Sequence, residues 1–221
     1  MIKIYVGICK TRDDERFWKS FHELKAALSD KYSVIMSIVR DTYLPDAQNW
    51  LAKQMLDAGS DYLLLLDDDQ WGHTIDMVDT LFEADAYVAT IKTYCRKYPY
   101  MCAAWNKVGA SKALVPIEYG FGYIECDLTG FPMTLIHKDT FKILEQPYFR
   151  PLEAEGRTWN SDVDFFERLA EHKIKPIVCF QHTLNHDKVT QENVYKLREA
   201  ERYEHNNEAW FNILKSLEKG A

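Results

Sequence analysis

One short segment limits what this chain can fold into: residues 61–69 read DYLLLLDDD. An unbroken apolar run of this length is typical of a strand that is buried on both faces, as in a parallel sheet covered by helices. The three carboxylates that follow it repel one another unless a positive charge lies among them. The segment therefore predicts a central strand whose carboxyl end carries a charged site.

The residues around this segment alternate between strand and helix patterns. Apolar residues at helical spacing predict helices over residues 13–32, 44–59 and 73–85. Short apolar runs predict strands over residues 2–8, 33–39, 61–66 and 86–92. This rhythm favours an α/β fold class in which a central, mainly parallel sheet is flanked by helices.

The second half of the chain has a less regular pattern. Residues 95–122 predict loops with short strands, and residues 125–144 predict a strand, a glycine turn, another strand and a helix. A helix over residues 159–173 starts with a capping box formed by Ser161 and Asp164, and residues 175–187 predict a strand that ends in polar side chains. We expect one domain over residues 1–188 and a helical C-terminal extension over residues 189–221 that packs on it.

The composition argues against several classes of protein. The chain has 221 residues and is 47% hydrophobic, which is enough for the core of a large domain. A formal net charge of −7 disfavours a nucleic-acid binder, which needs a basic surface. No window approaches the roughly 18 apolar residues of a membrane span, and the N-terminus turns charged too early for a secretory signal, so membrane contact is not expected. The five cysteines are scattered singly, and reduced thiols in a cytoplasm are the simplest interpretation.

The aspartates at residues 67–69 are the main candidate site. In open α/β sheets, ligands bind outside the carboxyl ends of the strands. Side chains alternate along a strand, so Asp67 and Asp69 should lie on one side and Asp68 on the other. A divalent cation with oxygen ligands would relieve the repulsion between two neighbouring carboxylates. The alternative interpretation is a solvated acidic turn that caps the next helix.

Several motifs, taken in order, resemble the GT-A glycosyltransferases, in particular the small family-2-like enzymes, over residues 2–187. DYLLLLDDD resembles their Asp-x-Asp segment, and LPDAQNWLAKQML resembles the preceding helix, which often has Arg where this chain has Gln48, followed by Asn49. IKTYCRKYP is similar to the segment after the fourth strand, where a Tyr and an Arg recur, here Tyr94 and Arg96. DLTGFPMTLIHKDTF, NSDVDFFERL and LNH resemble the acceptor-side strand, the Glu-Asp-x-Asp-Phe helix start and the late histidine of the metal site.

The resemblance implies an enzyme that binds a nucleotide-sugar donor with the help of Mn²⁺ or Mg²⁺. Asp69 would be a direct ligand of the cation, and His186 would complete the metal site. Asp67 would contact the cation, a water bound to it or the nucleotide ribose, and Asp68 would lie against the donor. The cation would neutralise the charge that builds up on the departing diphosphate.

Asp162 is the candidate catalytic base, because transfer with inversion needs a carboxylate that takes the proton of the attacking hydroxyl. The alternative is that acids at this position only favour a helix N-terminus through the helix dipole. The family usually has Glu before this Asp, where this chain has Ser161. Gly130 and Phe131 would form the floor under the donor sugar and the acceptor, and the donor contacts are expected from Cys9, Thr11, Arg12, Arg40, Asn49, Tyr94 and Arg96. The alternative is that Thr11 and Arg12 are solvated loop residues and that Gly130 is an ordinary turn glycine.

The leading hypothesis is a metal-dependent glycosyltransferase of the hexosyltransferase type that moves a sugar from a nucleotide diphosphate sugar, with UDP-sugars favoured, to a carbohydrate or other hydroxyl acceptor. Inversion is expected, and retention is the alternative, because retaining GT-A enzymes share the metal motif. A nucleotidyltransferase can share the fold and the metal, but it normally has a Gly-rich, basic loop after the first strand, and GICKTRDDERF has one glycine. A non-catalytic carbohydrate-binding relative is expected to have lost site residues, whereas Asp67, Asp69, Asp162 and His186 are all present.

Overall fold

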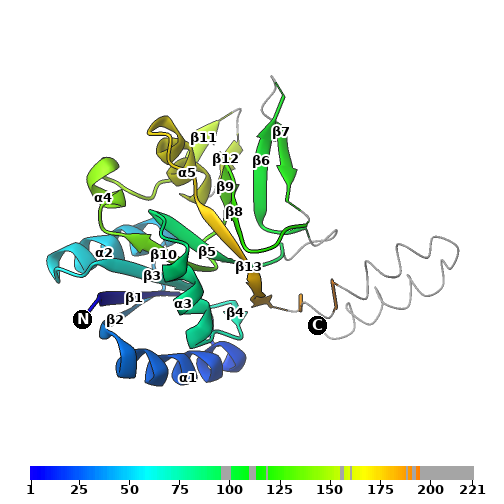
Figure 1. Ribbon diagram of the computed structural model, residues 1–221. Coiled ribbons are helices and arrows are strands. Elements are labelled where there is room, and N and C mark those ends of the chain that lie inside the picture. The colour runs from blue at the N-terminus through cyan, green and yellow to red at the C-terminus, as the bar shows by residue number, and fades with distance from the viewer. Residues whose placement is uncertain are drawn as a thin grey trace, which may run out of the picture.

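The computed structural model describes residues 1–95, 101–109, 113–117, 119–154, 157–159, 161–187, 189–190 and 193–194 (Figure 1). The helices are α1 (Glu15–Lys31), α2 (Leu44–Asp57), α3 (Ile75–Glu83), α4 (Thr140–Ile143) and α5 (Ser161–Glu171). The strands of the first half are β1 (Lys3–Lys10), β2 (Ser33–Arg40), β3 (Tyr62–Asp67), β4 (Gln70–Trp71), β5 (Val88–Lys92), β6 (Ala104–Val108) and β7 (Ala113–Pro116). Those of the second half are β8 (Tyr123–Glu125), β9 (Leu128–Thr129), β10 (Met133–His137), β11 (Leu152–Ala154), β12 (Arg157–Trp159), β13 (Ile177–Thr183) and β14 (Asn185–His186).

A seven-stranded sheet forms the centre of the molecule, with the strand order β2-β1-β3-β10-β5-β13-β8. β2, β1, β3, β5 and β13 run in one direction, whereas β10 is antiparallel to both of its neighbours and β8 is antiparallel to β13. The predicted α/β class with a mainly parallel central sheet is therefore confirmed. The sequence did not reveal that β10 lies between β3 and β5, two strands that precede it in the chain.

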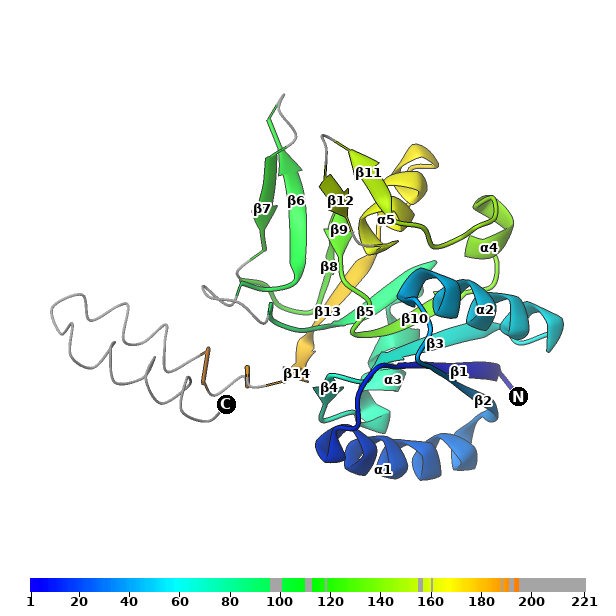
Figure 2. The ribbon, with the colours of Figure 1, turned by 180° about the vertical axis from the view of Figure 1, so that it is seen from behind.

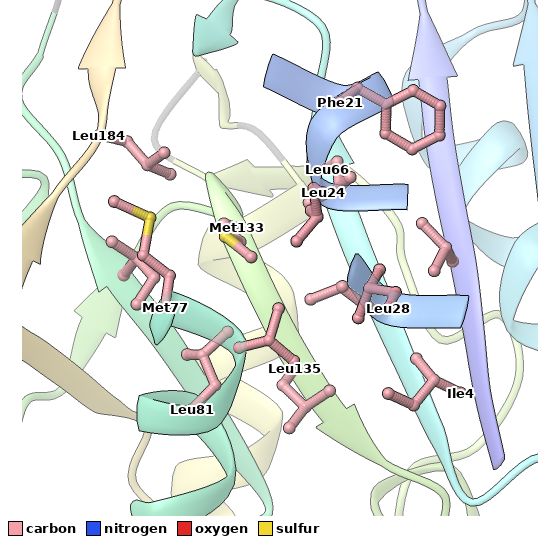
Figure 3. Packing of buried hydrophobic residues seen from close by; sticks show 14 of the residues in the cluster. Ile4, Phe21, Leu24, Leu28, Leu66, Met77, Leu81, Met133, Leu135 and Leu184 are labelled. Carbon is pink, nitrogen blue, oxygen red and sulfur yellow. The ribbon is translucent and has the colours of Figure 1, made fainter. Parts of the chain in front are cut away.

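Helices cover both faces of this sheet (Figures 1 and 2). One core cluster joins α1 and α3 to the sheet, and it includes Leu64 and Leu66 (Figure 3). A second cluster joins α2, α4 and α5 to the opposite face, and it includes Leu63 and Leu65. The four leucines are at most 3% exposed. The run is unbroken because both faces of β3 are buried, and each such side chain contributes about 1.5–3 kcal/mol to stability.

Three smaller pairings complete the fold: β7-β6-β9, β11-β12 and β14-β4. In the last of these, Gln70 is opposite His186 and Trp71 is opposite Asn185, so the residues just after the three aspartates pair with the chain that follows β13. Of the predicted C-terminal extension, Val189 and Val194 pack in a third apolar cluster, and residues 195–221 lie outside the described residues. No helix within the described ranges is both long enough and apolar enough to cross a membrane.

A cleft at the carboxyl ends of the strands

A cleft of about 550 Å³ opens at the carboxyl ends of β1 and β3. Most of the predicted site residues line it, namely Cys9, Thr11, Arg12, Asp67, Asp68, Asp69, Gly130, Phe131, Asp162 and His186. Burial, reinforced by the charges of Asp67 and Asp68, raises the pKa of the Cys9 thiol to about 12. Cys9 therefore lines the cleft as an uncharged group rather than as a nucleophile.

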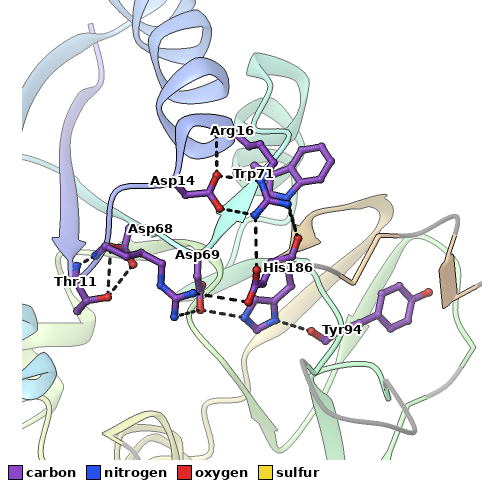
Figure 4. A network of polar contacts seen from close by, with 10 residues as sticks. Thr11, Asp14, Arg16, Asp68, Asp69, Trp71, Tyr94 and His186 are labelled. Atoms are coloured by element: carbon purple, nitrogen blue, oxygen red, sulfur yellow. Dashed lines mark hydrogen bonds and ion pairs between the residues drawn. The ribbon is translucent and has the colours of Figure 1, made fainter. Parts of the chain in front are cut away.

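Asp68 fixes the loop between β1 and α1. Its Oδ2 accepts hydrogen bonds from the backbone N–H groups of Thr11 and Arg12, each at 2.6 Å, and the Thr11 hydroxyl donates to its Oδ1 at 3.2 Å (Figure 4). The side chain of Asp68 is buried. A carboxylate that accepts several hydrogen bonds from its own chain shapes the cleft. Asp68 also lines the cleft, so its predicted contact with the donor stays a prediction.

The interpretation of the aspartates as a solvated helix cap is wrong. α3 starts after Thr74, whose hydroxyl accepts a hydrogen bond from the N–H of Met77, and β4 lies between the aspartates and that helix. Asp68 is buried, and the side chain of Asp69 is 13% exposed. Asp67 is the last residue of β3, and its backbone N–H donates to the carbonyl of Pro132. The acidic residues therefore belong to the cleft wall.

His186 contacts Asp69 across the β4–β14 pair. Its Nδ1 lies 2.7 Å from the carbonyl oxygen of Tyr94, which can only accept, so Nδ1 carries the proton of that hydrogen bond. Its Nε2 lies 3.2 Å from Oδ2 of Asp69. When the imidazole is neutral, Nε2 and the carboxylate are both acceptors, and only a proton or a metal ion between them makes the contact favourable.

A metal ion at this contact would depend on further ligands. Across the described ranges, no three His, Cys, Asp or Glu side chains converge into a ready-made metal site. The nitrogen and oxygen donors of His186 and Asp69 suit Mn²⁺ or Mg²⁺, and such ions are commonly held by one or two carboxylates together with phosphate oxygens of a substrate. His186 and Asp69 could supply two ligands to a divalent cation, and its remaining ligands would have to come from a bound molecule or from water.

Two arginines tie the acidic residues to the start of α1 (Figure 4). Arg16 donates to the carboxylate of Asp14, which caps α1, and to the backbone carbonyl of Asp187 at 2.9 Å. The guanidinium of Arg12 lies 3.7 Å from Oδ2 of Asp69 and 3.8 Å from Oδ2 of Asp187. The positive charges thus offset a concentration of carboxylates at this end of the cleft.

Asp162 belongs to the first turn of α5. Its Oδ1 accepts the N–H of Val163 at 2.9 Å, and a Cβ atom built on Gly130 would lie 3.9 Å from its Oδ2. Burial raises the pKa of this carboxyl to about 6, against the opposing effect of backbone N–H groups. Asp162 is thus a half-buried carboxyl group in the cleft that changes its charge close to neutral pH.

The predicted capping box at the start of α5 is wrong. Ser161 is the first helical residue, and its hydroxyl donates to Oε1 of Gln48 at 2.7 Å. Asp164 accepts hydrogen bonds from Nε of Arg150 at 2.9–3.0 Å and lies 3.4 Å from Arg168. The two acids of this turn therefore differ in their surroundings. Asp162 is half-buried and lines the cleft, whereas Asp164 is buried and ion-paired with two arginines.

Several predicted donor contacts lie elsewhere. The amide of Asn49 donates to the carbonyls of Pro45 and Phe149 and accepts the N–H of Phe149, so it holds a loop against α2 outside the cleft. Arg40 ends β2 at the edge of the sheet and does not line the cleft. Tyr94 contributes its carbonyl to His186, and its ring is buried in an apolar cluster. Arg96 lies outside the described residues.

The cleft also contains residues that the sequence did not indicate. Leu44 and Gln48 of α2, Thr93 and Cys95 after β5, and Trp105 of β6 all line it. In the sequence, Gln48 differs from the family pattern, but nothing there indicates that it lines a cleft. Trp105 lies in the irregular region between residues 95 and 122, where no local pattern distinguishes a cleft residue from a packing residue.

The similarities to known proteins concern the fold. No family model matches the chain, and no curated protein sequence does. The structure called A197 from STIV matches with a TM-score of 0.55 and 16% identity, covering 84% of this chain and 85% of that one. A glycosyltransferase involved in glycosylation of the major capsid of PBCV-1 matches with a TM-score of 0.37, 12% identity and coverage of 67% and 70%. Apo UDP-glucose pyrophosphorylase matches with a TM-score of 0.40, 11% identity and coverage of 80% and 73%.

At 16% identity, the match to A197 shows a shared fold. The matches with TM-scores of 0.37 and 0.40 are too weak to support any conclusion about this chain. The fold and the cleft together define a mixed α/β protein with a mainly parallel sheet and an acidic, histidine-containing cleft at the carboxyl ends of its strands. What this cleft does has to be argued from its own side chains.

Proposed function

We propose that the protein is a metal-dependent glycosyltransferase that moves a sugar from a nucleotide diphosphate sugar, with UDP-sugars favoured, to an acceptor hydroxyl with inversion. One observation carries the proposal. A single cleft contains the Asp69–His186 contact, which suits a cation, and the half-buried Asp162, whose pKa is raised to about 6. The reaction needs both, a positive charge for the leaving diphosphate and a base for the acceptor hydroxyl.

Asp69 and His186 would hold Mn²⁺ or Mg²⁺, with Asp67 as a further ligand or a contact to a metal-bound water. The bound cation supplies Lewis-acid stabilisation of the departing diphosphate. The hydrogen bond from Nδ1 of His186 to the Tyr94 carbonyl fixes the ring so that Nε2 is directed at Asp69. Such a bond to the outer nitrogen is the usual way in which proteins orient a metal-binding histidine.

Asp162 would take the proton of the attacking hydroxyl. A base with a pKa of about 6 is mostly ionised at pH 7 and still accepts a proton more readily than an exposed aspartate. Val163 holds Oδ1 through its N–H, and the space beside Gly130 leaves Oδ2 accessible for the acceptor. The absence of a side chain at Gly130 suits the close approach of a substrate.

The remaining walls of the cleft suit a nucleotide and a sugar. Asp68 holds the loop that carries Thr11 and Arg12, and Arg12 provides a positive charge near the expected diphosphate. Trp105 offers an aromatic surface on the β6 side. The backbone N–H groups of Thr11 and Arg12 already donate to Asp68, which leaves them unavailable to bind a triphosphate. This observation favours the glycosyltransferase over a nucleotidyltransferase, which would use such a loop for phosphate binding.

Calorimetry with UDP, GDP and UTP, each with Mn²⁺ or with EDTA, tests the proposal. We expect a nucleoside diphosphate to bind in Mn²⁺ and to lose most of its affinity in EDTA. A nucleotide at 100 times its dissociation constant should also stabilise the protein by about 2.7 kcal/mol in a thermal-shift assay. Equal affinity with and without the metal would contradict the metal site. Preference for UTP, with release of pyrophosphate on adding a sugar phosphate, would instead indicate a nucleotidyltransferase.

A further inference from the structure

The guanidinium of Arg12 lies beside the same carboxylate oxygen that His186 contacts. Nη2 of Arg12 is 3.7 Å from Oδ2 of Asp69. Nε2 of His186 is 3.2 Å from the same oxygen, and Figure 4 shows this contact. The side chain of Arg12 is 40% exposed, while that of Asp69 is 13% exposed. A partly exposed positive charge thus faces a nearly buried negative one.

The contact is electrostatic rather than a fixed pair of hydrogen bonds. Arginine–carboxylate bonds are normally below 3 Å and often bidentate, whereas both contacts of Arg12, to Asp69 and to Asp187, are 3.7–3.8 Å long. Arginine stays charged at every accessible pH, so Arg12 is a permanent counter-ion of this cleft. Asp68 holds the backbone of Arg12, whereas the guanidinium makes these two longer ion-pair contacts.

We infer that Arg12 competes with the divalent cation for Asp69 and leaves Asp69 when a nucleoside diphosphate binds, so that metal binding is coupled to donor binding. The inference rests on the proposed function, because it assumes the cation at Asp69 and His186. A cation coordinated to Oδ2 of Asp69 would lie within a few ångströms of the guanidinium, and the two positive charges repel. A diphosphate offers the guanidinium a new anionic partner, and Asp187 offers another.

The consequence is that the metal ion and the nucleotide bind cooperatively. Without nucleotide, Arg12 neutralises Asp69 and weakens the binding of the bare metal ion. With nucleotide, the metal and the diphosphate bind together, and each increases the affinity for the other by the same factor. A cleft of this kind does not hold a tightly bound metal ion when the donor is absent.

The test is a thermodynamic cycle measured by calorimetry on the full chain. The affinity for Mn²⁺ is measured alone and with saturating UDP, for the parent, Arg12→Gln, Arg12→Lys and Arg16→Gln. Arg16 is the matched control, because its side chain is 44% exposed and its ion pairs are with Asp14 and, at 3.6 Å, with Asp187 rather than with Asp69. We expect Arg12→Gln to bind Mn²⁺ alone about tenfold more tightly and to lose a similar factor of coupling between Mn²⁺ and UDP. Arg12→Lys, which keeps the charge, should stay close to the parent, and so should Arg16→Gln.

Two results would overturn the inference. The first is an unchanged or weaker affinity of Arg12→Gln for Mn²⁺ alone while the parent still shows metal-dependent UDP binding, which leaves the proposed function intact. The second is an equal gain of Arg16→Gln in affinity for Mn²⁺ alone, which would mean that only the net charge of the protein matters. If the parent binds UDP equally well in Mn²⁺ and in EDTA, the proposed function fails and this inference fails with it.

Discussion

Replacing Asp162 by Asn should make the protein more stable and nearly inactive. Asn keeps the size of the side chain and an oxygen that accepts the N–H of Val163, so the start of α5 is retained. It removes the charge that burial disfavours and the ability to accept a proton. Loss of a general base typically lowers the rate by about 10²- to 10⁴-fold.

The size of the stability gain follows from the pKa. Burial raises the pKa of Asp162 from 3.8 to about 6, and each pH unit of difference between the folded and unfolded states corresponds to about 1.4 kcal/mol. The ionised carboxylate therefore destabilises the fold by up to about 3 kcal/mol above pH 6. The folded state binds the proton more strongly than the unfolded state, so this contribution favours folding at low pH and is lost as the pH rises from about 4 to 6.

Urea unfolding of the parent and of Asp162→Asn at pH 4, 6 and 8 measures this contribution. The two proteins should differ little near pH 4, and the variant should be more stable at pH 8, by up to about 3 kcal/mol. In the parent, kcat/KM should fall as the pH drops below about 6, because the base becomes protonated. A variant that is no more stable at pH 8 would refute the electrostatic argument, and one that transfers sugar at the parent rate would refute the base.

Asp164→Asn is the matched control, two residues further along α5 in the same helical turn. Asp164 is buried and pairs with Arg150 and Arg168. Because Arg150 is half exposed and can be solvated, we expect this variant to lose only about 1–3 kcal/mol of stability. Its transfer rate at low temperature should stay close to that of the parent. The two substitutions should therefore act in opposite directions on stability and unequally on rate, a pattern that general damage to α5 would not produce.

Other predictions follow from single contacts. His186→Ala should weaken nucleotide binding in Mn²⁺ at least about tenfold by calorimetry, whereas His182→Ala, which lies outside the cleft, should change it little. Asp68→Ala leaves two backbone N–H groups without their acceptor, and urea unfolding should show a loss of about 1–3 kcal/mol. Ser161→Ala removes the hydrogen bond to the buried Gln48, and we expect a loss of about 1 kcal/mol; no change would mean that Gln48 finds another partner.

The parts of the fold that were predicted from sequence depend on local pattern. The leucine run predicted a strand covered on both faces. In the structure, Leu64 and Leu66 belong to one core cluster, and Leu63 and Leu65 belong to the cluster on the opposite face. The order of the strands depends instead on which distant segments pair. The place of β10 between β3 and β5 follows from long-range pairing that no short window contains.

The same distinction separates the site residues that were predicted from those that were not. Asp69 and His186 were expected together, and they lie in contact across β4 and β14. Asp68 lines the same cleft as its neighbours, but no local pattern indicates that its carboxylate also accepts two N–H groups of the loop after β1. Asn49 lies in the expected helix, but its side-chain amide is hydrogen-bonded to the backbone carbonyl and N–H of Phe149, one hundred residues further along the chain.

The two departures from the resemblance, Gln48 and Ser161, turn out to be partners. The family often has Arg at the first position and usually has Glu at the second, and here a neutral hydrogen bond of 2.7 Å joins two residues that are 2% and 3% exposed. A charged pair at this depth loses hydration that its mutual attraction only partly restores, and a neutral pair avoids that cost. The pKa of the adjacent Asp162 is then set by burial, opposed by backbone N–H groups, rather than by a neighbouring guanidinium that would lower it. A neutral Gln48–Ser161 pair is therefore compatible with a carboxyl group at residue 162 whose pKa stays raised.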